Sequence, residues 1–146
     1  MKTVAQNRKA RFDYDIVDTI EVGIILTGQE VKSCREGNMN LSGSYVSFQT
    51  GKPVLKAATI AKYRLASGAD DYEPGKDRIL LMKKNQGDRL QTQLEEKGVS
   101  LVPLEVKAGR YIKVVLGLGK GKKKYDKRQS KKKKDIERRL REGREV

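Results

Sequence analysis

The sequence predicts a mainly β protein: a small antiparallel barrel of about six strands with two short helices, followed by a basic C-terminal tail. Several segments alternate apolar and polar residues with a period of two, which is typical of half-buried strands. The strands do not alternate with long helical segments, so the pattern does not favour a parallel sheet with βαβ crossovers. Residues 119–146 carry fourteen Lys or Arg against five Asp or Glu and have few apolar side chains.

The first predicted strand covers residues 14–26. Its even positions are apolar apart from Asp18, and several polar residues lie between them. The next stretch, residues 27–37, places Val31 and Cys34 three positions apart and ends on a glycine. This spacing predicts a short helix with a glycine stop and with Cys34 on its inner face.

The middle of the chain indicates a hairpin, a loop and a further strand. Residues 44–49 and 53–60 flank a short turn-like link at 50–52, which favours a β-hairpin. Residues 66–76 are a loop by composition, and residues 78–83 are the next predicted strand.

A second helix and two more strands complete the predicted barrel. The helix covers residues 86–97, with Asn85 as its N-cap, Leu90 and Leu94 facing inward and Gly98 as its stop. Strands at 99–106 and 111–118 follow, joined by residues 107–110. The second strand places Ile112, Val114, Leu116 and Leu118 on one face, and Tyr111, Lys113 and Val115 on the other.

In a folded domain of this size, closure of the sheet into a small barrel is the simplest way to pair its edge strands. The OB-fold, a common oligonucleotide binder, is a barrel of this kind. We therefore expect an OB-like barrel over residues 1–118 and a separate tail over residues 119–146. So charged a tail is expected to be disordered when free and to bind a polyanion.

Composition excludes several classes of function. The chain has 146 residues, no histidine and a single cysteine, Cys34, so His-based nucleophile pairs and zinc fingers are excluded. Neither an apolar run long enough to span a membrane nor a secretory signal is apparent, and we expect a cytoplasmic protein. The net charge of +14 favours nucleic acid as the partner. We expect no enzyme activity, no cofactor and no metal.

Four features have competing interpretations. Gly117, Gly119 and Gly121 favour a flexible exit from the last strand over a phosphate-binding loop. Cys34 is interpreted as a small buried residue and not as a nucleophile. The carboxylates Asp13, Asp15 and Asp18 are interpreted as a solvated strand face and not as a Mg²⁺ site. Tyr125 interrupts a basic run and suits base stacking, although an exposed tyrosine without a role is the alternative.

Basic residues of the body form a candidate RNA-binding patch. Asn7, Arg8, Lys9 and Arg11 precede the first predicted strand, and Lys32, Arg35 and Lys113 lie on later elements. Such residues on folded elements can position a phosphate backbone. Scattered surface charge is the alternative.

Six short segments, taken in their order and spacing, carry a family resemblance. They are AQNRKARFDY at 5–14, EVGIILTGQEVKS at 21–33, GSYV at 43–46, RILL at 78–81, GVSLVPL at 98–104 and GKGKKKYDKR at 119–128. With these segments the chain resembles the tmRNA-binding proteins (SsrA-binding protein, small protein B) of bacterial trans-translation. The resemblance implies a six-stranded OB-like barrel with three short helices. It also implies binding to the tRNA-like domain of tmRNA and delivery of that RNA to ribosomes stalled without a stop codon.

The resemblance also implies the site residues and partners. RNA contacts match Glu21, Leu80 and Lys113, with Asn7, Lys9 and Arg11 nearby, and Lys32 is added from the basic patch. Contacts at the ribosomal decoding centre match Tyr125, Asp126, Lys127 and Arg128. The implied partners are tmRNA, the small-subunit rRNA near the decoding centre and mRNA channel, and elongation factor Tu through aminoacylated tmRNA. We expect a monomer. Gln29, Thr59 and Val106 depart from the residues that many members carry.

Two other functions remain open from the residues themselves. A ribosomal protein with a basic arm would have the same composition, and near-stoichiometric occupancy on washed ribosomes would identify it. An RNA-processing enzyme is the second, and a nuclease assay with added Mg²⁺ would test it.

Overall fold

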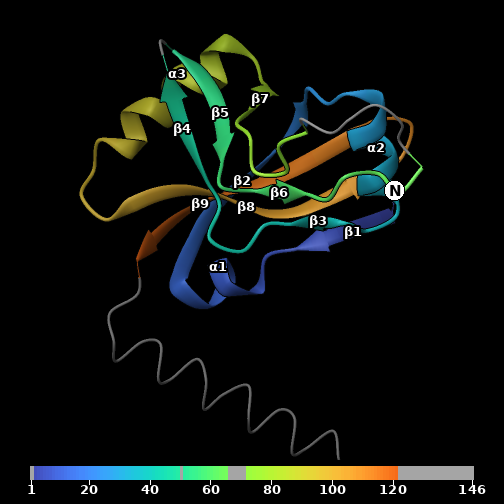
Figure 1. Cartoon of the computed structure of the whole chain (residues 1–146). Coiled ribbons are helices and arrows are strands. Elements are labelled where there is room, and N and C mark those ends of the chain that lie inside the picture. The colour runs from blue at the N-terminus through green and yellow to red at the C-terminus, as the bar shows by residue number, and fades with distance from the viewer. Residues whose placement is uncertain (1, 50, 66–71, 122–146) are drawn as a thin grey trace, which may run out of the picture.

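The computed structural model describes residues 2–49, 51–65 and 72–121 (Figure 1). Most of the predicted loop at 66–76 and the tail beyond residue 121 lie outside these described residues. The strands are β1 (Lys2–Gln6), β2 (Tyr14–Ile24), β3 (Met39–Asn40), β4 (Tyr45–Gln49), β5 (Lys52–Lys56), β6 (Thr59–Ile60), β7 (Arg78–Leu81), β8 (Val99–Ala108) and β9 (Ile112–Gly121). The helices are α1 (Arg8–Asp13), α2 (Gly28–Arg35) and α3 (Lys84–Leu94).

Seven strands form one antiparallel sheet in the order β1-β8-β9-β2-β7-β5-β4, and β3 pairs with β6. The sheet curls so far that β4 contacts β8, although the two strands lie far apart in this order and no backbone ladder joins them within the described residues. This arrangement confirms the predicted small antiparallel barrel. The strands β1 and β3 were not predicted, since β3 has only two residues and β1 is an edge strand.

The main core lies inside the curled sheet. Ile112, Val114, Leu116 and Leu118 of β9 are all buried there, which confirms the predicted face. The alternation of β2 lapses at Asp18 because the register between β2 and β9 shifts between Ile16 and Asp18. A bulge of this kind moves the following residues onto the opposite phase.

Helix α1 was not predicted, and it covers the outer face of the sheet near the end of β9 (Figure 1). Ala10 of α1 packs on Val102 and Leu104 of β8 in a second, small apolar cluster. Six residues give too short a periodic pattern for a sequence-based prediction.

The glycines of β9 lie beneath this second cluster. A Cβ atom at Gly117 would lie 2.7 Å from Leu104 Cδ1, and one at Gly119 would lie 2.8 Å from Tyr14 Cβ. The prediction of a flexible exit here was wrong: β9 continues in register to Gly121, opposite Tyr14. These glycines allow side chains from β2 and β8 to lie directly on the β9 backbone.

Two other predicted boundaries need correction. Strand 53–60 is divided by Ala57, whose φ of 63° breaks the extended backbone between β5 and β6. Helix α3 begins at Lys84, earlier than predicted, so Asn85 lies in its first turn and Lys83 takes the N-cap position. The predicted helix at 27–37 is confirmed by α2, and Gly37 follows it with φ +84°. No helix of the described residues is both long and apolar enough to cross a membrane.

Candidate nucleic-acid interface

One row of residues crosses four strands on the outer face of the sheet. Gly23 of β2 lies opposite Leu81 of β7 on one side and Lys113 of β9 on the other, and Lys113 lies opposite Lys107 of β8. Residues directly opposite in an antiparallel pair point to the same face. Leu81 and Lys113 therefore flank Gly23, and the Leu81 side chain leans over this glycine, because a Cβ atom there would lie 3.3 Å from Leu81 Cβ.

The adjacent row contains Glu21, Val115 and Glu105, which are opposite one another in register. Glu21 is exposed, whereas Glu105 is paired with Lys107 at 3.6 Å. Lys113 has no ion-pair partner among the described residues. The structure thus brings two of the predicted RNA contacts, Glu21 and Lys113, onto one face, where a carboxylate and a cation are both open to a ligand.

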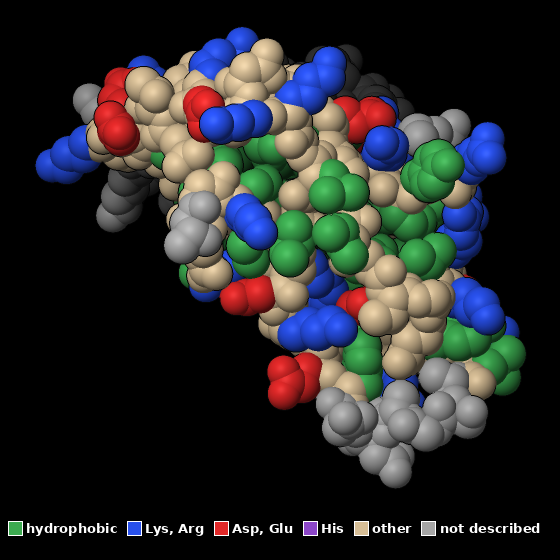
Figure 2. All heavy atoms as spheres, turned by 90° about the horizontal axis from the view of Figure 1, so that it is seen from above, with side chains coloured by type: hydrophobic (Ala, Val, Ile, Leu, Met, Phe, Trp, Pro, Cys, Tyr) green, Lys and Arg blue, Asp and Glu red, His purple; other side chains and the backbone are tan. Residues whose placement is uncertain are grey.

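Apolar side chains lie exposed around this row. Ile25, Ile79, Leu81 and Tyr111 are between 45% and 63% exposed. The Ile25 N–H donates to the Ile79 carbonyl at 3.0 Å, so these two strand ends are neighbours. Figure 2, which shows the molecule from above the view of Figure 1, shows hydrophobic side chains gathered on that side with charged side chains of both signs around them. Apolar patches with a charged rim are typical of interaction sites.

Helix α2 adds one cation, Arg35, at the edge of this face. The Arg35 Nη2 donates to the carbonyl oxygen of Arg110 at 3.4 Å, which ties α2 to the turn between β8 and β9. Lys32 lies one turn earlier, and its Nζ is 5.6 Å from the centre of the Tyr63 ring. Of the predicted basic patch, the structure thus places Arg35 beside the face that carries Lys113, whereas Arg8, Lys9 and Arg11 lie on α1.

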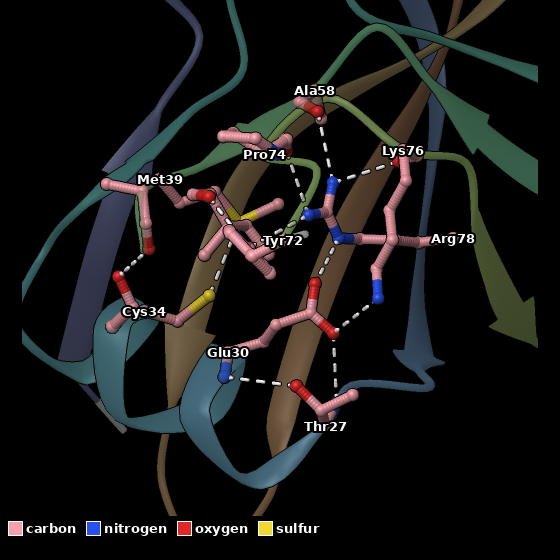
Figure 3. A network of polar contacts seen from close by, with 12 residues as sticks. Thr27, Glu30, Cys34, Met39, Ala58, Tyr72, Pro74, Lys76 and Arg78 are labelled. Atoms are coloured by element: carbon pink, nitrogen blue, oxygen red, sulfur yellow. Dashed lines mark hydrogen bonds and ion pairs between the residues drawn. The ribbon is translucent and has the colours of Figure 1, made fainter. Parts of the chain in front are cut away.

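A buried arginine fixes α2 and the segment before β7 (Figure 3). Arg78 Nε donates to Glu30 Oε2 at 2.8 Å, and both side chains are almost fully buried. The two other guanidinium nitrogens donate to four oxygens: the carbonyls of Ala58, Lys76 and Pro74 and the hydroxyl of Tyr72. One side chain thus joins α2 to the chain on both sides of residues 66–71.

Glu30 is also held by the start of its own helix. The Thr27 N–H donates to Glu30 Oε1 at 3.0 Å, and the Glu30 N–H donates to Thr27 Oγ1 at 3.4 Å, which forms a capping box. Burial alone would raise the pKa of Glu30, but the hydrogen bonds from Thr27 and Arg78 and the charges of Arg78 and Lys76 lower it below its ordinary value. Glu30 is therefore ionised at neutral pH.

Cys34 lies behind this ion pair and is fully buried. Burial raises the pKa of its thiol to about 11. Its Sγ faces Met39 Sδ at 3.7 Å. This confirms the interpretation of Cys34 as a small buried residue.

Three other predicted RNA contacts lie elsewhere in the fold. Asn7 is buried at the N-cap of α1: its amide donates to the carbonyls of Leu41 and Pro103, and its Oδ1 accepts from the Ala10 N–H. Lys9 and Arg11 are on α1, near the opposite end of β9 from Lys113 (Figure 1). The structure does not bring these three residues into the row with Lys113.

Leu80 points into the core and is 2% exposed. The surface that β7 offers is made by its neighbours Ile79 and Leu81. Leu81 and Tyr111 were not predicted from the sequence to be RNA contacts. The alternation of β7 was a signal that Leu81 points outward, and the position of Tyr111 after the turn before β9 was a signal that it does so too. Tyr125, Asp126, Lys127 and Arg128 lie outside the described residues.

The fold and this face define a class: a small β-barrel nucleic-acid-binding protein with a mixed apolar and cationic surface. The family model described as SmpB protein matches residues 4–145. The SsrA-binding protein of Shouchella clausii is 47% identical over 94% of this chain and 88% of its own length. The SsrA-binding protein of Thermus thermophilus is 43% identical over 97% of this chain and 99% of its own.

A solved structure agrees with these relatives. A chain in the structure described as "tmRNA-SmpB: a journey to the center of the bacterial ribosome" has a TM-score of 0.68 and 43% identity, covering 90% of this chain and 92% of that one. This chain belongs to the SmpB protein family.

Proposed function

We propose that this protein is a non-catalytic RNA-binding adaptor of trans-translation. It binds the tRNA-like domain of tmRNA and delivers the RNA to ribosomes stalled without a stop codon. The observation that carries this proposal is the match to the SmpB family over residues 4–145. The outer face that presents Lys113 and Glu21 in adjacent rows supports it.

The outer face supplies the chemistry for recognition by shape. Lys113 offers a cation to the RNA backbone, and Glu21 accepts hydrogen bonds from ribose hydroxyls or bases. Asn7 supports this body from inside, since its side chain holds α1 to the barrel.

The tail supplies a second contact, with the ribosome. Tyr125 stacks on small-subunit rRNA near the decoding centre, and Asp126, Lys127 and Arg128 contact the same region and the mRNA channel. Elongation factor Tu joins through the aminoacylated tmRNA. The protein acts as a monomer in the cytoplasm, where the ribosomes are.

Replacing Lys113 tests the phosphate contact. Lys113→Ala should weaken binding to the tRNA-like domain and reduce the slope of log K against log salt by about one. Lys120→Ala is the matched control, because Lys120 lies on the same strand but is already paired with Glu96 at 3.3 Å. Equal losses in the two variants would show that only total charge matters and would contradict the assignment of this face.

Removing the tail tests the division between the two contacts. A chain ending at Gly121 keeps β9 complete, whereas an end at Leu118 would remove the last residues of the strand. The shortened chain should keep its preference for the tRNA-like domain over bulk tRNA and lose peptide tagging on stalled ribosomes. Loss of that preference at physiological salt would contradict the proposal that the barrel recognises tmRNA.

A further inference from the structure

A hollow of about 230 Å³ opens beside the proposed RNA-binding face, between α2 and the first residues of β9. Ile24, Leu26, Val31 and Ile112 are its more buried lining residues, so its floor is aliphatic. Its rim carries the exposed side chains of Arg35, Arg110 and Tyr111, and the half-buried Lys113 also lines it. Among the described residues that line it, none is acidic.

This combination of groups is matched to one kind of ligand. The aliphatic floor accepts a flat apolar surface, and the Tyr111 ring offers a stacking partner. The three cations Arg35, Arg110 and Lys113 attract negatively charged groups of the ligand. An unstacked nucleotide presents these features together: a base with two π-faces and a phosphate on each side. A base inside a duplex keeps its faces covered by its neighbours and cannot enter.

Tyr111 is the residue best placed to meet such a base. Its side chain is 63% exposed, although it is a large apolar ring. The Arg110 guanidinium lies 5.7 Å from the ring centre, and the Gly109 N–H donates to the Tyr111 carbonyl at 3.2 Å. Arg35 holds the same turn through the Arg110 carbonyl. The turn is therefore fixed at its backbone while the ring stays open to solvent.

A larger hollow, of about 420 Å³, lies on another side of the barrel between α1, β4 and β8. It contains Lys9 but also Asp13, so it offers phosphate a less favourable surface. It shares no lining residue with the hollow at Tyr111 among the described residues. The smaller hollow differs from this one because Lys113 of the proposed RNA-binding face is among its lining residues.

We infer that the hollow beside Tyr111 holds one unstacked nucleotide of the partner RNA, its base on the Tyr111 ring and its phosphates beside Lys113, Arg35 and Arg110. This inference rests on the proposed function, since the RNA is the one that the outer face binds. It adds a requirement to that function: the bound RNA must present at least one unpaired, extruded base next to the surface that Lys113 contacts.

Binding of a transcript of the tRNA-like domain tests the inference. Tyr111→Ala should weaken binding by about 5- to 150-fold, the range for loss of one stacked base. Tyr111→Trp should restore most of the affinity, because it keeps a flat ring. The salt slope should stay that of the wild type, because no charge is removed. Tyr45→Ala is the matched control: Tyr45 is also exposed, at 47%, but lies on β4.

A scan of the RNA completes the test. Single abasic nucleotides are placed in turn at each unpaired position of the tRNA-like domain. At one position, loss of the base should weaken binding to the wild-type protein but should have little further effect on binding to Tyr111→Ala. This non-additivity is what a double-mutant cycle shows for two groups in contact.

The outcomes separate the two proposals. The wild type could bind tmRNA while Tyr111→Ala and Tyr45→Ala bind it with equal affinity, or while no abasic position is coupled to Tyr111. Either result would overturn the nucleotide site alone. A wild-type protein with no preference for the tRNA-like domain over bulk tRNA would overturn the proposed function and, with it, the nucleotide site.

Discussion

Replacing Arg78 by methionine should remove a large part of the stability of the barrel. The Arg78 and Glu30 side chains are 1% and 2% exposed, so their ion pair is shielded from water. Arg78→Met leaves Glu30 as a buried carboxylate, with Lys76 as its remaining cation at 3.6 Å. It also removes the donors to the carbonyls of Ala58, Lys76 and Pro74.

The expected loss is about 3–5 kcal/mol, the range for breaking one side of a buried ion pair. A domain of this size has a free energy of unfolding of about 5–15 kcal/mol, so the variant would be left marginal. With a urea m-value of about 1–3 kcal/mol/M, the unfolding midpoint should fall by more than about 1 M. Replacing Glu30 by methionine as well should recover only part of the loss, because the three carbonyls still lack their donor.

Urea unfolding followed by far-UV circular dichroism measures this loss. Arg89→Met is the matched control, since Arg89 is paired with Asp18 at 3.8 Å but both side chains are more than half exposed. That exposed pair should contribute less than about 1 kcal/mol. If the free energies of unfolding of Arg78→Met and Arg89→Met lay within about 1 kcal/mol of each other, the buried contacts of Arg78 would not be what fixes α2 to the segment before β7.

The remaining predictions concern Glu30, a glycine of β9 and the buried thiol. The lowered pKa of Glu30 contributes stability that is present above its unfolded value of 4.5 and is lost as the pH falls through the folded pKa. The stability difference between wild type and Glu30→Gln should therefore shrink on acidification below pH 4.5, and urea titrations at about pH 7 and about pH 3 would show it. Gly119→Ala should destabilise the barrel by about 1–3 kcal/mol, because the added Cβ atom would contact Tyr14. Gly28→Ala is the control and should be near neutral, because no atom lies within 4 Å of a Cβ atom at that position. The same urea titration measures both variants. Cys34 should resist Ellman's reagent in the folded protein at a pH of about 8 and react at once in urea, because burial raises the pKa of its thiol to about 11; fast labelling of the native protein would contradict this.

The longer strands could be predicted because their two faces meet different surroundings. The alternation from Ile112 to Leu118 followed the true inner and outer faces, and so it placed Lys113 outward correctly. Short elements carried no such signal. Helix α1 and the strands β1 and β3 are stabilised by distant parts of the chain: β1 pairs with β8, β3 pairs with β6, and Asn7 at the start of α1 bonds the carbonyls of Leu41 and Pro103.

The candidate site shows the same limit. Lys113, Gly23 and Leu81 are far apart in the chain, and only the register of β7, β2 and β9 makes them one row. The sequence singled out Gly117 and Gly119 as a glycine pattern. Glycine is needed there because the side chains of Leu104 and Tyr14 lie directly above these positions, and no local pattern reveals that contact. Local periodicity can assign a face to each strand, but it cannot tell which strands become neighbours.

The position of β9 has a mechanical consequence. The last described strand lies between β8 and β2 and is paired with one or both of them along its whole length. A force that pulls on Gly121 along the axis of β9 loads these bonds together in shear, because they run perpendicular to the strand. A force directed across the strand would instead open the bonds one at a time. If the ribosome holds the tail as proposed, an axial pull on Gly121 would therefore move the barrel, with its bound RNA, as one rigid body.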